Sequence, residues 1–294
     1  MRAELVLDTR CGLGEGPVWD ERGRLLYWVD IIAGRVQRWA PDSARVETME
    51  AGEPVGAVAL CEDGGLVCAA QSGFAVAERF GGALRPLASY EGASSEIRMN
   101  DGKCDPAGRF WAGTMAFDFR PGAGALYRLD PDGTVRRVLE GVTISNGMDW
   151  TADGARMYYI DSLRRTVDVF DFDAETGAIC GRRTVVEIPE DAGVPDGMTL
   201  DAEGRIWVAL WGGGAVRCYS PEGKLEEVIE VAAPQTTSCC FGGEDFSVLY
   251  ITSARDGLSE AQLAGAPHAG GVFAARPGAR GRAAHRYRRT TGAA

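Results

Sequence analysis

Four polar residues occupy equivalent places in a repeated phrase of the sequence and could together hold a metal ion. Each stands eight residues before a glycine that opens an apolar run: Glu15, Asn100, Asn146 and Asp196. Carboxylate and amide oxygens suit a hard divalent cation, and two carboxylates balance its charge. Without a cation, facing carboxylates would repel and one would take up a proton. The set predicts a divalent metal site, although such residues before a glycine are also common in simple turns.

The phrase around these residues is an internal repeat. Each copy contains a strand, a turn and a second strand rich in large apolar residues. In one copy Val55 stands at the position of the polar residue, which we call the polar slot. A degenerate sixth copy starts at Thr237. The turn glycines lie 41, 44, 46 and 50 residues apart, at Gly23, Gly64, Gly108, Gly154 and Gly204. Periods of roughly 40–50 residues are typical of propeller blades.

The repeat therefore predicts an all-β fold, a six-bladed β-propeller. In a propeller the innermost strand of each blade runs beside the central channel. Equivalent positions of the repeat then lie at similar heights around one axis. We expect the four polar residues to converge at one end of the channel and to form the metal site there.

The termini give further expectations about the chain, which we interpret as a single domain over residues 1–294. Residues 4–11 read as a strand that could close the ring by pairing with the last blade. Residues 254–267 form a helical or looped insertion in that blade. Residues 276–294 are a basic, partly disordered tail, in which Tyr287 and its neighbouring arginines are expected to finish an outer strand.

Composition and charge narrow the possible functions. The chain has 294 residues, 45% of them hydrophobic, and a net charge of −11. This charge argues against a nucleic acid or an anionic membrane as partner. The sequence has neither the apolar run of a signal peptide nor the roughly 18 apolar residues that a membrane helix needs. We therefore expect a cytoplasmic protein.

Cysteine and histidine usage limits the chemistry. The eight cysteines include no C-x-x-C pair, and most of them are expected to be buried, reduced thiols, with a redox role left open for Cys239-Cys240. The two histidines, His268 and His285, have no nucleophile motif nearby. If the protein is an enzyme, its chemistry must rest on carboxylates, amides and a metal that accepts oxygen ligands.

The neighbours of Asn100 extend the candidate site. Arg98 stands two residues earlier, and side chains two apart in a strand share one side. We therefore expect Arg98 to face the channel and to contact a substrate. Asp101 should face the other side, where a hydrogen bond within a turn or between blades is its simplest role. For Lys103 a structural and a functional role both stay open.

Four segments resemble those of the senescence marker protein/gluconolactonase family, the regucalcin-like sugar lactonases. They are LGEGPVWD, IRMNDGKCDPAGRFWAGTM, ISNGMDW and VPDGM, and the resemblance runs from Gly12 to Phe273. It implies a six-bladed propeller with one divalent cation in the channel, whether Ca, Zn, Mn, Mg or Fe. It further implies the metal ligands, which are Glu15, Asn146 and Asp196.

The resemblance also implies roles around the cation. Arg98 and Asn100 would hold substrate hydroxyls, and Asp196 would double as general base. Some family members contact the sugar through an acidic residue shortly after a G-T-M sequence. Here the sequence is GTMAFDFR, so Asp118 is the nearest match and Phe117 replaces the neighbouring acid.

The expected activity is metal-dependent hydrolysis of a glucono-, galactono-, xylono- or arabinolactone-like substrate to the aldonic acid. The cation would polarise the lactone carbonyl, and a carboxylate would activate the attacking water. The small sugar lactone is the expected partner, since the polar set of Arg98, Asn100 and Asp118 suits a polyhydroxylated ligand. Two alternatives stay open: a phosphotriester or aryl-ester hydrolase using the same site, and a binding propeller without catalysis.

Overall fold

Each copy of the repeat folds into two antiparallel strands joined by a tight turn. Around Asp196, β18 (Val194–Leu200) pairs with β19 (Ile206–Trp211). Asp201 opens the turn between them by accepting hydrogen bonds from two backbone N–H groups of the same turn, at 3.1 and 2.8 Å. Gly204 supplies the φ of 82° that the turn requires, a conformation that glycine adopts without steric cost.

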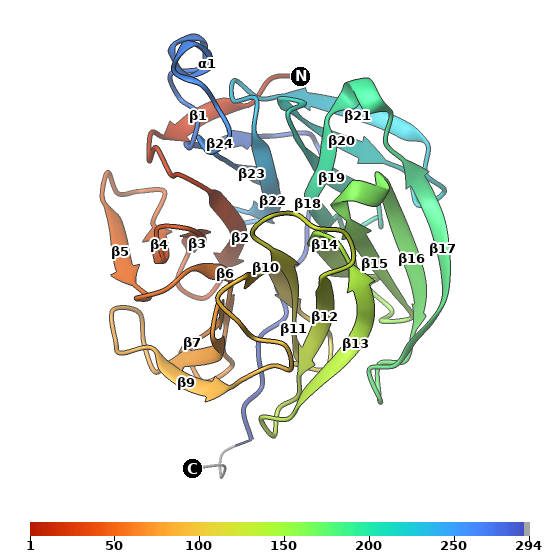
Figure 1. Cartoon of the computed structure of the whole chain (residues 1–294). Coiled ribbons are helices and arrows are strands. Elements are labelled where there is room, and N and C mark those ends of the chain that lie inside the picture. The colour runs from red at the N-terminus through yellow and green to blue at the C-terminus, as the bar shows by residue number, and fades with distance from the viewer. Residues whose placement is uncertain (291–294) are drawn as a thin grey trace.

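The computed structural model describes residues 1–290 and arranges the strands in six four-stranded sheets around a central channel (Figure 1). This confirms the six-bladed β-propeller that the repeat predicts. The first three blades are β2 (Gly14–Asp20), β3 (Leu25–Asp30), β4 (Arg35–Trp39) and β5 (Val46–Glu50); β6 (Val55–Leu60), β7 (Leu66–Ala70), β8 (Gly73–Ala77) and β9 (Arg85–Ala88); and β10 (Ile97–Cys104), β11 (Phe110–Ala116), β12 (Gly124–Leu129) and β13 (Val135–Val142).

The last three blades carry the helical elements as well. The fourth contains β14 (Ser145–Trp150), β15 (Arg156–Asp161), the short 3₁₀ helix η1 (Ser162–Arg164), β16 (Thr166–Phe172) and β17 (Ile179–Glu187). A second 3₁₀ helix, η2 (Glu190–Ala192), leads into the fifth, whose outer strands are β20 (Ala215–Tyr219) and β21 (Leu225–Glu230). The sixth contains β22 (Thr236–Gly242), β23 (Val248–Ser253), α1 (Glu260–Gly265) and β24 (Val272–Ala275).

The ring closes through the N-terminal strand, as expected. β1 (Glu4–Leu7) adds an outer strand to the sixth blade by pairing antiparallel with β24, with Leu5 opposite Phe273. Ala3 donates a backbone hydrogen bond of 2.8 Å to Glu230 of the fifth blade. The first residues of the chain therefore hold the last two blades together, and Figure 1 shows β1 beside β24.

The expected insertion in the sixth blade contains a helix. α1 starts with a capping box, in which Ser259 and Gln262 satisfy each other's backbone N–H groups. The helix is only one and a half turns long and exposed. Within residues 1–290 no helix is long and apolar enough to span a bilayer.

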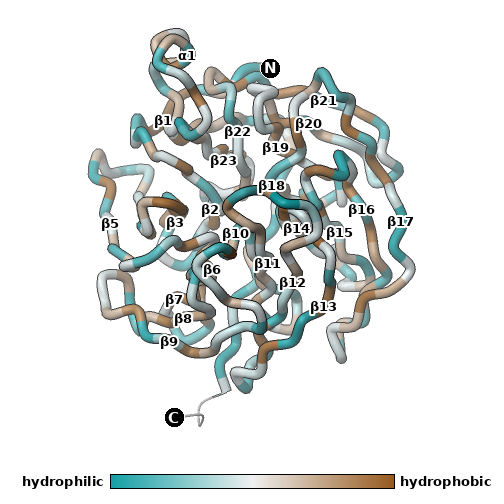
Figure 2. The backbone as a smooth tube through the Cα atoms, viewed as in Figure 1, coloured by the Kyte–Doolittle hydropathy of each residue, from teal (hydrophilic) through white to brown (hydrophobic). Residues whose placement is uncertain are grey.

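The hydrophobic core lies between neighbouring blades. The indole rings of Trp111 and Trp150, from the third and fourth blades, lie 5.8 Å apart between ring centroids, and both side chains are fully buried. Inner strand β14 is buried along its whole length, whereas outer strand β17 is mostly exposed and carries a hydrophilic stretch (Figure 2). Burial of one blade face against the next therefore stabilises the ring and fixes the innermost strands.

After β24 the chain crosses one face of the propeller and contacts every blade. Figure 1 shows this C-terminal segment running behind the innermost strands. Its arginine-rich sequence meets acidic side chains and free backbone groups at the blade ends. The contacts, from the first blade to the sixth, are Arg286 with Asp20 and Glu21, Tyr287 N with Leu60 O, Arg288 N with Gly108 O, Arg282 with Trp150 O, Arg280 O with Ala202 N, and Gly281 N with Phe246 O.

The expectation that Tyr287 finishes an outer strand is wrong. Tyr287 forms a bridge with Cys61, at the end of inner strand β6, and its buried hydroxyl donates to Asp130 O at 3.1 Å. The outer edge of the sixth blade is already occupied by β1, so the chain after β24 continues across the face instead. Residues 276–290 are packed in this way, and 291–294, for which disorder is predicted, lie outside the described residues.

Candidate metal centre and active site

The polar residues of the repeat meet in one cavity. Glu15 on β2, Asn100 on β10, Asn146 on β14 and Asp196 on β18 line a cavity of about 320 Å³ at one end of the channel, and Arg98 joins them. All five side chains are buried, with exposed fractions of 3–7%. The full lining consists of Leu13, Glu15, Ile31, Arg98, Asn100, Met115, Phe119, Ile144, Asn146, Ser162, Leu163, Val194, Pro195, Asp196, Trp211 and Asp256.

A bulge in each innermost strand turns these side chains toward the channel. Pairing with the second strand shifts register at the polar slot, for example between Ser145 and Met148 and between Pro195 and Met198. Such a bulge redirects a side chain that would otherwise stay in the alternating pattern of the sheet. The same shift occurs in all six blades, so the geometry belongs to the repeat.

The glycine that follows the polar residue has a packing role. A Cβ on Gly147 would lie 2.7 Å from the backbone nitrogen of Met198 in the next inner strand. A Cβ on Gly197 would lie 2.8 Å from the Cα of Ser238. Neighbouring inner strands approach too closely for any side chain here. At Asn146-Gly147 and Asp196-Gly197 the pair is therefore a candidate site residue followed by a close contact between blades.

Asn146 has the arrangement of a ligand. Its Nδ2 donates to the Ser162 hydroxyl at 3.0 Å, which fixes the orientation of the amide. Its Oδ1 is buried and has no hydrogen-bond partner among residues 1–290. A buried polar atom without a partner costs about 1–3 kcal/mol. An oxygen held in this state in a cavity with two buried carboxylates fits a group that binds a cation.

Glu15 and Asp196 provide the negative charge. Burial raises the pKa of both carboxyl groups, and the charge of Asp196 raises the pKa of Glu15 further. Opposing this, the N–H of Gly16 donates to Glu15 Oε2 at 2.6 Å, and the Asn146 amide lowers the pKa of Asp196. Two carboxylates in a buried site are stabilised by a divalent cation, which supplies the missing positive charge.

Asn100 differs from Asn146 because both ends of its amide are engaged. Arg98 Nη1 donates to Asn100 Oδ1 at 2.6 Å, and Asn100 Nδ2 donates to Ser145 O at 2.8 Å. Burial lowers the pKa of Arg98 to about 10, although the nearby carboxylates of Glu15 and Asp196 favour its charged form. Asn100 thus positions the guanidinium of Arg98, whose other N–H groups can meet a substrate.

The structure does not bring Asp118 into the cavity with the others. Its side chain is 60% exposed and pairs with Arg120 at 2.9 Å, and Arg120 in turn reaches Glu96 at 2.8 Å. The next residue, Phe119, lines the cavity instead. A turn between β11 and β12 directs the two side chains differently, a detail that strand alternation does not predict.

Sequence reasoning missed the residues that come from connections between the second and third strands of a blade. The second strand runs back toward the polar slot, so the loop that follows it lies at the site end. Phe119, Ser162, Leu163 and Asp256 belong to such connections, and Trp211 ends a second strand. Nine of the sixteen lining residues are apolar, so the cavity is less polar than the sequence predicts.

The sequence model of one family, the SMP-30/Gluconolactonase/LRE-like region, matches residues 13–255. The chain belongs to this family. Bovine (Bos taurus) regucalcin is 43% identical over 279 residues, which are 93% of each chain. The structure of the calcium-binding protein regucalcin from Agrobacterium tumefaciens superposes with a TM-score of 0.93 at 30% identity, over 97% of each chain. A luciferin-regenerating enzyme superposes with a TM-score of 0.90 at 30% identity, over 97% of this chain and 98% of its own.

Family membership supports a lactonase-like activity and places the chain among gluconolactonase-like propellers. The calcium-binding relative points to a metal in the family. The candidate ligands here fit a hard cation, since they combine two buried carboxylates with an unpartnered amide oxygen. Across residues 1–290, no group of three or more His, Cys, Asp or Glu side chains is placed to hold a metal ion, so the candidate site depends on two carboxylates and an amide oxygen.

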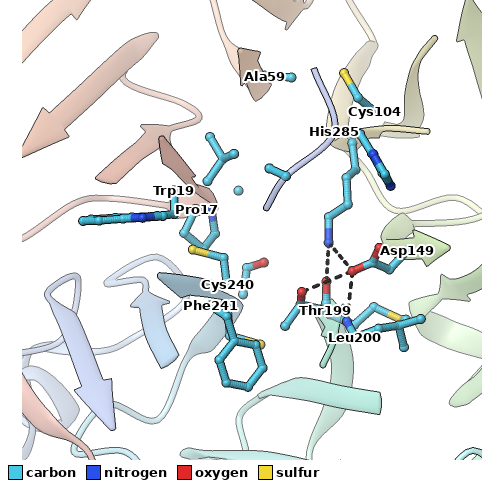
Figure 3. Close-up of a pocket in the computed structure, with 18 of the residues that line it drawn as sticks. Pro17, Trp19, Ala59, Cys104, Asp149, Thr199, Leu200, Cys240, Phe241 and His285 are labelled. Carbon is cyan, nitrogen blue, oxygen red and sulfur yellow. Dashed lines mark hydrogen bonds and ion pairs between the residues drawn. The ribbon is translucent and has the colours of Figure 1, made fainter. Parts of the chain in front are cut away.

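The protein has a second cavity at the opposite end of the channel, where residues 282–285 of the tail cover it (Figure 3). Its polar centre is structural. Lys103 Nζ donates to Asp149 Oδ2 and to Met198 O, both at 3.1 Å, and so links β10, β14 and β18. The same carboxylate oxygen accepts from Thr199 Oγ1 at 3.2 Å and from the N–H of Leu200 at 2.9 Å. Lys103 therefore has a structural role.

Asp101 also lines this second cavity, as do the neighbouring cysteines Cys239 and Cys240. Asp101 does not line the cavity of the metal candidates, and it accepts the N–H of Gly102 at 2.7 Å. Its charge nevertheless raises the pKa of both Glu15 and Asp196. Burial raises the pKa of Cys240 to about 12 and the pKa of Cys239 even higher, so both are thiols near neutral pH. All eight cysteines are free, and seven are buried while Cys180 is exposed.

We expect Asp149→Asn to lower stability at pH 7 and to flatten the decline in stability at acid pH. Burial alone would raise the pKa of Asp149, but Lys103, Arg282 and two backbone N–H groups lower it below its usual value. A carboxylate with a lowered folded-state pKa contributes stability that is fully present above about pH 4. That contribution is lost as the pH falls through the folded-state pKa. Because Lys103 is partly exposed, we expect a loss of ~2 kcal/mol at pH 7.

Urea unfolding at pH 7 and at pH 3 checks this expectation. Lys103→Met should destabilise the protein in the same way, and the double variant should lose less than the sum of the two single changes. Additive losses, or an unchanged pH dependence in Asp149→Asn, would show that the two charges do not act as a pair.

Proposed function

We propose that the protein is a divalent-metal-dependent hydrolase that opens aldono-lactones to aldonic acids. The observation that carries the proposal is the unpartnered Asn146 Oδ1 beside the buried carboxylates of Glu15 and Asp196. The Arg98 guanidinium in the same cavity supports an oxygen-rich substrate. Family membership supports the lactonase class, and the choice of aldono-lactone is our inference from these residues.

In this proposal Glu15, Asn146 and Asp196 hold the cation. When bound, it would polarise a carbonyl oxygen and lower the pKa of water, as divalent cations do in other hydrolases. Any of the hard divalent cations would suit the oxygen ligands. The remaining chemistry belongs to side chains of the chain itself.

Arg98 and Asp196 perform the substrate steps. Arg98 donates to a ring hydroxyl or to the carbonyl oxygen and so orients the lactone, while Asn100 keeps the guanidinium in place. Asp196 accepts a proton from the water that attacks the carbonyl carbon. The bond between that carbon and the ring oxygen then breaks, and the ring oxygen takes the proton back from Asp196. The product is the open-chain hydroxy acid.

The eight free thiols suit a reducing compartment, and we propose that the enzyme acts in the cytoplasm.

A proton-release assay over glucono-, galactono-, xylono- and arabinolactone tests the proposal, with and without a chelator. We expect the chelator to abolish turnover of at least one lactone and added metal to restore it. Spontaneous opening must be subtracted. If no lactone shows metal-dependent acceleration, the proposal is wrong.

Arg98→Ala separates the lactonase from an aryl-ester or phosphotriester hydrolase on the same site. Arg98 contacts a substrate hydroxyl or carbonyl in our mechanism, so lactone turnover should fall by about 10²-fold or more. Turnover of an aryl ester should fall much less. Equal losses on both substrates would favour the ester hydrolase.

A further inference from the structure

The catalytic cavity is divided into a polar floor and apolar walls. The floor consists of the buried ligand candidates together with Arg98 and Asn100. The walls come from Met115, Ile144, Trp211 and other apolar residues, and the mouth is bordered by Phe119 and Leu163. Phe119 is 57% exposed and Leu163 is 51% exposed, so both present apolar surface to whatever enters.

The polar groups that remain for a substrate are few. Both ends of the Asn100 amide are engaged by the protein, and Asp118 pairs with Arg120 outside the cavity. Arg98, Ser162 and Asp256 are the other polar residues at hand. A lactone with hydroxyls on every ring carbon would place several of them against apolar walls, where a buried hydroxyl without a partner is costly.

Phe119 is held in a conformation that bulky residues avoid. Its φ is 58°, in the left-handed region, and its N–H donates to Ala116 O at 3.1 Å. The guanidinium of Arg120 donates hydrogen bonds to both Asp118 and Glu96, and so links the two residues that flank Phe119 to Glu96. Strained backbone of this kind persists where the surrounding structure enforces it, and it clusters at ligand sites. Here the strain places an exposed aromatic ring at the cavity mouth.

We propose that the cavity selects lactones with an apolar alkyl or aryl substituent on the ring carbon far from the carbonyl, and that Phe119 is the specificity-determining contact. This inference rests on the proposed function. The carbonyl and its neighbouring hydroxyl face Arg98 and the metal ligands, while the substituent packs against Phe119, Leu163 and Trp211. Within the proposed lactonase activity, the cavity thereby favours lactones with one polar and one apolar side over fully hydroxylated aldono-lactones.

The test compares kcat/KM of the metal-loaded enzyme for δ-valerolactone, δ-octalactone and glucono-δ-lactone. Each buried CH₂ of the alkyl chain strengthens binding, so we expect a rise of about tenfold or more from δ-valerolactone to δ-octalactone. Phe119→Asn should reduce the δ-octalactone value by about 5–20-fold, a loss several times larger than the loss it causes on glucono-δ-lactone. Asparagine tolerates a positive φ, so the turn is kept.

Leu225→Ser is the matched control, because Leu225 is also an exposed apolar residue but lies on outer strand β21, outside the cavity lining. It should leave all three substrates unchanged. No dependence on chain length, or an equal loss on all substrates in Phe119→Asn, overturns this inference while glucono-δ-lactone turnover still supports the proposed function. If no lactone is turned over in a metal-dependent way, both fail.

Discussion

Replacing Asp196 by asparagine is expected to retain the fold and part of the metal affinity but to lower turnover by about 10²–10⁴-fold, the usual contribution of a general base. The amide keeps an oxygen for the cation, the role that we propose for the unpartnered Oδ1 of Asn146. It lacks the charge and the basic lone pair needed to accept a proton from water. The inner-strand bulge and Gly197 are unchanged, so the geometry of β18 should persist.

Glu15→Gln is the matched comparison, because it removes the same charge without removing a base. The amide oxygen of glutamine can still accept the N–H of Gly16, which now donates to Glu15 at 2.6 Å. We therefore expect weaker metal binding and turnover that recovers at saturating metal. Measuring kcat of both variants across a metal titration separates the two roles. If saturating metal rescues Asp196→Asn as fully as Glu15→Gln, Asp196 is only a ligand and another group is the base.

The second large effect is expected at Asn146. Asn146→Ala removes the unpartnered buried oxygen and should weaken metal affinity by more than the roughly 10–100-fold that is typical of changes around a metal ligand. In metal-free protein the same change should lower the free energy of unfolding by only about 1 kcal/mol or less, because removal of a buried oxygen without a partner offsets the lost hydrogen bond from Nδ2 to Ser162. Calorimetric titration and the metal-induced rise in Tm report both effects independently of catalysis.

Ser162→Ala tests how the amide is oriented. The Ser162 hydroxyl accepts the Asn146 Nδ2 hydrogen bond at 3.0 Å, and without it the amide can rotate. We expect metal affinity to fall by about 10-fold, less than for Asn146→Ala. Wild-type affinity in Asn146→Ala would contradict the assignment of Asn146 as a ligand, and a larger loss in Ser162→Ala than in Asn146→Ala would move that role to the hydroxyl.

The sequence by itself determined the blade number and the meeting of Glu15, Asn100, Asn146 and Asp196. Both follow from local spacing. The repeat sets where each strand and turn begins, and a propeller places equivalent positions around one axis whatever the loops do. The closure of the ring by residues 4–7 was likewise predictable, since the first residues alternate as a strand and the sixth blade lacks one.

Only the tertiary structure decided which groups are free to act. Asn100 and Asn146 look alike in the repeat, but Arg98 engages one amide oxygen and leaves the other unpartnered. Asp118 and Phe119 are adjacent, yet only the phenyl ring lines the cavity. Tyr287 is predicted at an outer edge and lies instead between the second and third blades, against Cys61 and Asp130. These outcomes depend on contacts between segments far apart in the chain and on loop backbone angles, neither of which the period of the strands encodes.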